Sequence, residues 1–238
     1  MTVKYYDWVD YQSNFRPKKI AIKEISNGRE TSYYELNQRS KSLAGGLQKK
    51  GLKKGDRVAI LAHNCAEVFE LEFACGKIGG VELPLNWRLT KPELEYILND
   101  SEPMALIYSI EFKDIAQELI KDCGIKNSLM IEENNNGSEY EQAILEKNDF
   151  ETVESNHDDL IMLMYTSGTT GHPKGAMINH QMQFFNTVNL GATARITDKT
   201  IQLVVLPLFH TGGMNCYANP ILHNGGQIVL MKEFDPGK

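Results

Sequence analysis

The sequence changes character within Leu160-Ile161-Met162-Leu163-Met164-Tyr165-Thr166-Ser167-Gly168-Thr169-Thr170-Gly171-His172-Pro173-Lys174-Gly175, where an apolar run gives way to a polar, glycine-containing stretch. A short apolar run that ends at turn residues is typical of a buried strand. The polar stretch is therefore expected to be a loop at the carboxyl end of a strand. Because ligands bind at that edge in open α/β sheets, this boundary predicts an α/β fold and the position of a site.

The loop has the composition of a phosphate-binding segment. Glycines allow successive backbone N–H groups to converge on an anion, hydroxyls add donors, and Lys174 supplies a compact positive charge. The order of residues fits neither a Walker A loop nor the dinucleotide fingerprint. The residues alone also leave open an ordinary surface loop rich in Ser, Thr and Gly.

Helix signals recur in the first half of the chain. Ser32 and Glu35 predict a capping box at the start of one helix. Asn64 and Glu67 are candidate caps of a second helix, and Thr90-Lys91-Pro92-Glu93 predicts the start of a third. Between and after these helices, apolar runs predict strands at 58–62, 104–108, 160–164, 203–206 and 227–231, and a further helix is expected within 181–190.

Strands that alternate with helices predict right-handed crossovers and a mostly parallel sheet. The loop-like residues 134–138 and the acidic segment 146–159 suggest a connection between two structural units, with a boundary near Ser155. The expected organisation is therefore two α/β units in sequence.

Composition excludes several classes of protein. The 238 residues carry a formal net charge of −6, which argues against nucleic-acid binding because such proteins normally have a basic face. No apolar run reaches the length of a membrane-spanning helix, and the first residues lack the apolar core of a signal peptide, so a cytoplasmic protein is expected. The four cysteines are too scattered for a metal site and are expected to be reduced, structural thiols; they are Cys65, Cys75, Cys123 and Cys216.

The whole 165–175 string resembles the signature loop of the adenylate-forming superfamily, in its acyl-CoA synthetase version. This superfamily comprises acyl-CoA synthetases, luciferases and the adenylation domains of peptide synthetases. Four further stretches resemble landmarks of the family in the family's order: Thr31-Ser32-Tyr33-Tyr34-Glu35-Leu36, Gly55-Asp56-Arg57-Val58-Ala59-Ile60, Pro84-Leu85-Asn86-Trp87-Arg88-Leu89-Thr90 and Leu206-Pro207-Leu208-Phe209-His210-Thr211-Gly212-Gly213. The resemblance extends from about Tyr5 to the last residue.

The resemblance implies a reaction in which ATP activates a carboxylic acid, here expected to be a fatty acid, to acyl-AMP and pyrophosphate before coenzyme A takes the acyl group. It implies that the loop binds the phosphates of ATP and that one of its hydroxyls, taken as Thr170, contacts Mg²⁺. The implied nucleotide-binding residues are Thr166, Ser167, Gly168, Thr169, Thr170, Gly171 and Lys174, of which Thr166 and Lys174 are also expected to be catalytic.

His210 follows a strand-like apolar segment, and the family places this histidine between the acyl pocket and the thiol channel. The charge of a histidine at such a place can respond to its surroundings. A catalytic role and a contact with the acid are expected, with Phe209 and Met214 as pocket lining, although core packing explains those two almost equally well. His172 is expected to face solvent. The other histidines show no spacing typical of metal binding; they are His63, His157, His180 and His223.

The family also implies how the chain is divided. Residues 1–30 are expected to pack on the second α/β unit, 31–154 to form the first unit, and 155–238 to form part of the second unit and carry the phosphate loop. The resemblance implies two mostly parallel sheets flanked by helices, the second sheet incomplete. The family's magnesium-binding Glu, ribose-binding Asp and C-terminal catalytic Lys do not occur in this sequence. The chain is thus expected to be an N-terminal fragment that is inactive alone and could form homo-oligomers through an exposed sheet edge.

Two alternatives stay open. One is an enzyme that adenylates an amino acid or aryl acid and loads it onto a carrier protein. The other is a non-catalytic nucleotide-binding module. Exchange of pyrophosphate into ATP, measured with a panel of acids for the full-length protein and for this chain, is expected to separate the three possibilities.

Overall fold

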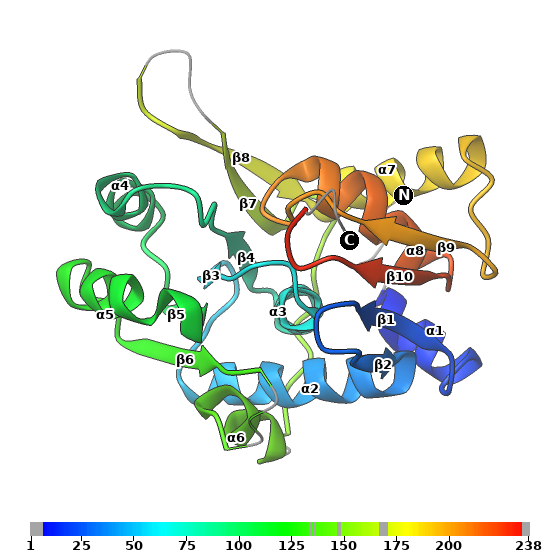
Figure 1. Cartoon of the computed structure of the whole chain (residues 1–238), viewed down its shortest axis with the longest axis horizontal. Helices are drawn as coiled ribbons and strands as arrows, with labels where there is room; N and C mark the ends of the chain where they lie inside the picture. Colours follow the sequence, from blue (N-terminus) through cyan, green and yellow to red (C-terminus); the bar gives the residue numbers. More distant parts are fainter. Residues whose placement is uncertain (1–6, 134, 136, 147–148, 167–170, 235–238) are drawn as a thin grey trace.

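The computed structural model describes residues 7–133, 135, 137–146, 149–166 and 171–234, which form an α/β structure with two sheets flanked by helices (Figure 1). The predicted fold class is therefore confirmed. The strands are β1 (Ile20–Glu24), β2 (Glu30–Ser32), β3 (Arg57–Leu61), β4 (Val81–Pro84), β5 (Ala105–Ser109), β6 (Asn127–Ile131), β7 (Leu160–Thr166), β8 (Lys174–Asn179), β9 (Ile201–Val204) and β10 (Gln227–Leu230).

Helices separate these strands along the chain, except between β1 and β2 and between β7 and β8. The α-helices are α1 (Trp8–Phe15), α2 (Tyr33–Lys49), α3 (Ala66–Ile78), α4 (Lys91–Ser101), α5 (Lys113–Asp122), α6 (Glu139–Leu145), α7 (His180–Thr193) and α8 (Asn219–His223). Two shorter elements are the 3₁₀ helix η1 (Ile110–Phe112) and the π-helix η2 (Gly212–Ala218).

The larger sheet has the order β6-β5-β3-β4-β7-β8 and the smaller sheet the order β2-β1-β10-β9. All described pairings are parallel except β1 with β2 and β7 with β8, which are antiparallel. The smaller sheet joins distant parts of the chain, since Ile22 of β1 lies opposite Ile228 of β10.

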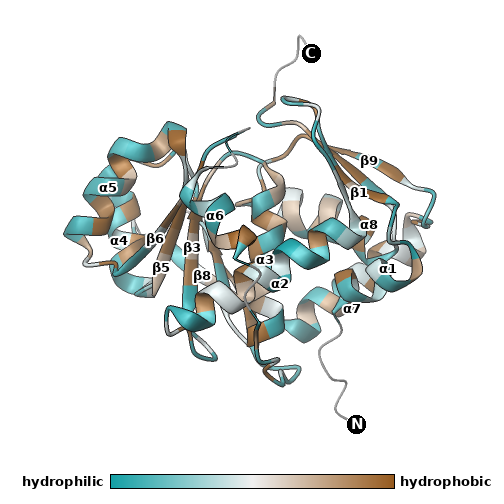
Figure 2. Cartoon of the chain, turned by 90° about the horizontal axis from the view of Figure 1, so that it is seen from below, coloured by the Kyte–Doolittle hydropathy of each residue, from teal (hydrophilic) through white to brown (hydrophobic). Residues whose placement is uncertain are grey.

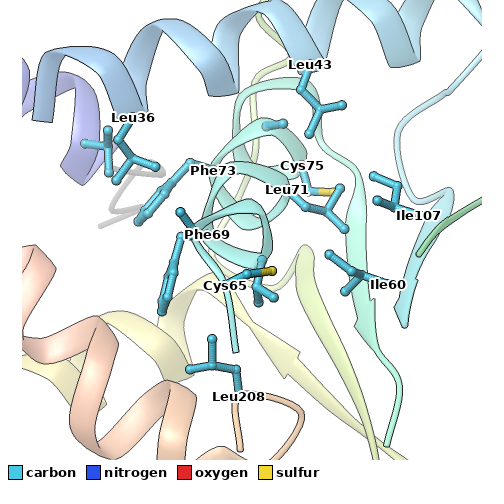
Figure 3. Close-up of a cluster of buried hydrophobic side chains, with 14 of the residues drawn as sticks. Leu36, Leu43, Ile60, Cys65, Phe69, Leu71, Phe73, Cys75, Ile107 and Leu208 are labelled. Carbon is cyan, nitrogen blue, oxygen red and sulfur yellow. The ribbon is translucent and has the colours of Figure 1, made fainter. Parts of the chain in front are cut away.

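Two hydrophobic layers cover the larger sheet (Figure 2). On one face, α4 and α5 pack on a cluster that includes Leu61, Leu106 and Leu119. On the other face lies a larger cluster to which both sheets, α2 and α3 contribute. Every residue of α3 is buried, so this helix fills the space between the sheets, with Phe69 and Leu71 at its centre (Figure 3).

Helix caps test the sequence predictions directly. The predicted capping boxes are present, with Ser32 and Glu35 at the start of α2 and Thr90 and Glu93 at the start of α4. The predicted cap of α3 is wrong. Its N-cap is Cys65, which makes no capping side-chain hydrogen bond, whereas Asn64 lies one residue earlier and binds a different part of the chain.

The placement of the strand before the phosphate loop also needs correction. This strand was expected in the second unit, after a boundary near Ser155. Instead β7 lies beside β4 in the larger sheet, with Met162 opposite Glu82. The antiparallel strand β8, which begins at Lys174, was not expected from the sequence. A strand's apolar pattern shows that it is covered on both faces, but it does not specify which strand lies next to it.

Candidate functional site

The β7–β8 hairpin brings the two ends of the predicted phosphate loop together. Thr166 lies directly opposite Lys174, and Tyr165 lies opposite Gly175. Thr166 and Lys174 are both exposed, so a hydroxyl and an ammonium group are available at the end of the hairpin. The predicted contacts Ser167, Gly168, Thr169 and Thr170 lie outside the described residues.

Gly175 lies close to two side chains of the opposite strand of this hairpin. A Cβ atom at this position would lie 2.8 Å from Cδ1 of Leu163 and 3.3 Å from the ring of Tyr165. A glycine at this position leaves room for the Tyr165 ring and for Leu163. Burial, and then the hydrogen bond to Asp100, raise the pKa of Tyr165, so its hydroxyl stays protonated at neutral pH.

A cavity of about 660 Å³ lies beside the hairpin. It brings together residues from three separate sequence landmarks, because Thr166 and Gly171 come from the predicted phosphate loop, Leu85 from the strand end after β4, and His210 from the segment after β9. The full lining is Pro84, Leu85, Asn86, Leu89, Pro92, Glu93, Tyr96, Ile97, Tyr165, Thr166, Gly171, His172, Pro173, Phe209 and His210.

His210 is exposed at this cavity, and its backbone surroundings fix its tautomer. The backbone N–H of Gly212 donates to Nδ1 of His210 over 3.1 Å. Nδ1 must then be the acceptor, so Nε2 carries the proton in the neutral ring. The side chain can therefore donate a hydrogen bond from Nε2 to an oxygen atom of a ligand.

Phe209 is half-buried and packs on residues from the Pro84–Thr90 landmark. Its ring meets the ring of Trp87 edge to face, with centroids 6.2 Å apart. The guanidinium carbon of Arg88 lies 4.7 Å from the centroid of Trp87 and 5.9 Å from that of Phe209. These aromatic and cation–π contacts fix one wall of the cavity.

Asn64 holds the segment that leads to His210, a role that the sequence did not reveal. Its Nδ2 donates to the carbonyl oxygens of Leu206 and Met231, over 3.0 and 3.1 Å, and its Oδ1 accepts from the N–H of Leu208 over 2.9 Å. The residue is only 5% exposed. One side chain after β3 of the larger sheet thus fixes two segments that follow strands of the smaller sheet.

Gly213 allows a close backbone approach just after His210. A Cβ atom there would lie 2.4 Å from the carbonyl oxygen of Pro207 and 2.7 Å from that of Leu206. The next residue, Met214, is fully buried in the larger hydrophobic cluster and does not line the cavity. Met214 therefore packs in the core, the other role considered for it, and does not line this cavity as predicted.

A buried carboxyl group supports the helical segment that follows. Oε1 of Glu72 accepts hydrogen bonds from the side-chain amides of Gln183 and Asn219. Glu72 and its neighbour Glu82 are almost completely buried. Burial raises the pKa of Glu72 to about 7, and burial followed by the charge of Glu72 raises the pKa of Glu82.

The remaining histidines and the cysteines differ in how deeply they are buried. His172 is exposed, as expected, but it also lines the cavity and stacks on Tyr96. Burial lowers the pKa of His180 to about 4 and also lowers that of His223. Cys65 and Cys75 are buried free thiols, whereas Cys216 is exposed.

Within the described residues, no group of three or more His, Cys, Asp or Glu side chains is arranged to hold a metal ion. In the same part of the chain, no helix combines the length and the apolar character that crossing a bilayer requires.

Several known proteins are similar to this chain in sequence and in structure. The model of the AMP-binding enzyme family matches residues 9–238. A feruloyl-CoA synthase of an Amycolatopsis species is 35% identical over 97% of this chain and 44% of its own length. A long-chain-fatty-acid–CoA ligase of Mycobacterium tuberculosis is 30% identical over 93% of this chain and 44% of its own length.

Among solved structures, the crystal structure of ATP-bound MatB from Rhodopseudomonas palustris superimposes with a TM-score of 0.86 and 30% sequence identity. The match covers 98% of this chain and 46% of that chain. The chain thus spans about half the length of the curated relatives that it matches.

Proposed function

Because the chain belongs to the AMP-binding enzyme family, we propose that the full-length protein is an acid–CoA ligase. A carboxylate would attack the α-phosphate of ATP to give acyl-AMP and pyrophosphate, and the thiol of coenzyme A would then displace AMP to give the thioester. The names of the relatives support this reaction. The observation that carries the proposal is the single cavity that joins Thr166 and Gly171, at the ends of the phosphate loop, to His210.

The phosphate side of the site would act by electrostatics. Negative charge accumulates on the departing pyrophosphate, so preorganised donors and a cation lower the barrier. Lys174 supplies the charge and Thr166, opposite to it, a hydroxyl donor. The other proposed contacts are Ser167, Gly168, Thr169, Thr170 and Gly171.

Mg²⁺ is an expected companion of ATP, and Thr170 is its proposed protein ligand. Mg²⁺ is commonly held by few protein groups together with phosphate oxygens and water, so one hydroxyl beside the triphosphate would suit such a site. The ion would neutralise charge on the phosphates when it is bound.

His210 would orient the acid. With Nδ1 accepting from Gly212, the Nε2–H group can donate to a carboxylate oxygen and leave the other oxygen free to attack. Phe209 would shield this contact from water, since its ring packs on Trp87. Met214 is not included in the proposed acid site because it is buried in the core.

An apolar acid is the proposed substrate. Seven of the fifteen lining residues are Leu, Ile, Pro or Phe, and no Lys or Arg belongs to the lining, so a second carboxylate on the substrate would lack a strong partner among the described residues. A fatty acid is our first choice, as for the ligase of M. tuberculosis, and an aryl acid is the second, as for the feruloyl-CoA synthase.

The test is acid-dependent exchange of pyrophosphate into ATP by the full-length protein, with fatty acids of several lengths and hydroxycinnamic acids. Exchange followed by thioester formation with coenzyme A supports the proposal. Exchange that leads to loading of a carrier protein, or no exchange with any acid, would overturn it. Lys174→Ala should lower the exchange rate about tenfold or more because it removes a charge-assisted contact. Lys126→Ala, at an exposed position of the same residue type, is the matched control.

A further inference from the structure

Helix α4 contacts the chain on both sides of the phosphate loop. The hydroxyl of Tyr165 donates to Oδ2 of Asp100 over 2.5 Å. The ring of His172 stacks on Tyr96, with centroids 4.9 Å apart and planes inclined by 22°. Tyr96 and Asp100 are four residues apart in the helix and therefore lie on the same face. One helix face thus contacts the residues that precede and follow 167–170.

The helix that makes these contacts is fixed at both ends. Thr90 and Glu93 form the capping box at its start. At its end, the guanidinium group of Arg57 in β3 donates to the carbonyl oxygens of Ser101 and Glu102, over 2.5 and 2.9 Å. Between the ends, the buried side chains are Leu94, Ile97 and Leu98. A helix with satisfied termini and a buried stripe is a rigid platform for surface contacts.

Packing also restricts the two tyrosine side chains that make these contacts, Tyr165 and Tyr96. The ring of Tyr165 lies against Gly175, which leaves it room, and both Tyr165 and Tyr96 pack on the hydrophobic cluster beneath α4. The hydroxyl of Tyr165 and the ring of Tyr96 are therefore presented by side chains with restricted freedom. Such preorganisation is what a binding loop needs from the residues that support it.

We propose that Tyr96 and Asp100 are positioning residues for ATP. By holding His172 and Tyr165, they set the position of Thr166 and Lys174 relative to the triphosphate. This inference rests on the proposed function and deepens it, because it assigns part of the nucleotide affinity to a helix outside the signature loop. Small displacements of phosphate-binding groups are costly for the reaction they align.

The experiment measures pyrophosphate exchange by the full-length protein and its variants, with separate KM values for ATP and for the acid. Tyr165→Phe and Asp100→Ala each remove one partner of the hydrogen bond. Each is expected to raise the KM for ATP about fivefold and to leave the KM for the acid within about twofold. The double variant should be no worse than either single variant, since both delete the same interaction.

Substitutions of Tyr96 test the stacking contact. Tyr96→Phe keeps the ring and should behave as the unaltered protein, whereas Tyr96→Ala should raise the KM for ATP. The controls are Asn99→Ala, at an exposed position of α4, and Tyr34→Phe, at an exposed tyrosine outside the cavity lining. Both controls should leave the KM for ATP unchanged. A parallel rise of both KM values, or additive effects in the double variant, would overturn the inference and indicate a general loss of packing.

Direct ATP binding, measured by calorimetry without an acid, separates this inference from the proposed function. If the unaltered protein binds ATP but exchanges no pyrophosphate with any acid, the proposed function fails, while weaker ATP binding by Asp100→Ala would still support the positioning role. Equal ATP affinity in Tyr165→Phe, Asp100→Ala and Tyr96→Ala would overturn the positioning role. Absence of ATP binding by the unaltered protein would overturn both.

Discussion

Two segments form the proposed site, and they are held in place in different ways. The segment around His210 is fixed from the interior, by the three hydrogen bonds of the buried Asn64 and by the close approach of Gly213 to Pro207. The phosphate-loop hairpin is held by the pairing of β7 with β4 in the larger sheet, and near its loop by contacts of Tyr165 and His172 with α4 at the surface. Substitutions in the interior anchor of the His210 segment should therefore cost stability, whereas loss of the α4 contacts should affect ligand binding first.

Gly213→Ala should have the largest effect on stability. The added methyl group would clash with two backbone carbonyl oxygens, and these oxygens cannot move unless the backbone around them moves. We expect a loss of about 3 kcal/mol in the free energy of unfolding, measured by denaturant titration. The control is Gly191→Ala in α7, where a Cβ would approach only the end of the Asn224 side chain. Equal stability of both variants would show that the His210 segment is not fixed by close packing.

Asn64→Ala should have the next largest effect. It removes the hydrogen-bond partner of two buried groups, the N–H of Leu208 and the carbonyl of Met231, and of the partly buried carbonyl of Leu206. The expected loss is about 2 kcal/mol in the free energy of unfolding. Asn189→Ala, at an exposed position of α7, is the control and should cause no loss. If Asn64→Ala were as stable as Asn189→Ala, Asn64 would not anchor the segment around His210.

A smaller effect is expected from pH through Glu72. Burial raises its folded-state pKa from 4.5 to about 7, so between these values the folded protein retains a proton that the unfolded chain has lost. The free energy of unfolding should therefore fall as pH rises, by about 1 kcal/mol between about pH 6 and about pH 7 from this group, and the loss is complete above its folded pKa.

Glu72→Gln should flatten this part of the stability profile, because the amide does not titrate. The control is Glu118→Gln on α5, at a carboxylate whose side chain is 61% exposed. Thermal unfolding followed at several pH values measures the difference. A slope that persists unchanged in Glu72→Gln would assign the pH dependence to another group.

The smallest effect on stability is expected at His210 itself. The side chain is exposed, so His210→Ala should change the free energy of unfolding by less than about 0.5 kcal/mol. Under the proposed function, the same variant should change acid selectivity or thioester formation more than ATP affinity, measured by exchange and calorimetry. A weaker affinity for ATP with unchanged dependence on the acid would instead place His210 on the nucleotide side of the cavity.

Local patterns were predicted well where the neighbours in sequence are also the partners in space. The capping boxes at Ser32 and Thr90 each involve residues three positions apart, and both are present. Asn64 shows where prediction from local patterns fails. It lies next to the start of α3, at a place where a capping residue is expected. Its side chain nevertheless binds residues more than a hundred positions away, and no local signal distinguishes the two roles.

Residue patterns along the chain were enough to predict the alternation of helices and strands, the polar, glycine-containing stretch after β7, and the resemblance to adenylate-forming enzymes. The packing of the elements was needed to show that β7 joins the larger sheet, that Met214 belongs to the core, and that α4 contacts Tyr165 and His172. The reason is physical. The periodicity of a strand or helix depends on residues that are close in sequence. The neighbours of a strand and the long-range partners of a side chain depend on how whole elements pack.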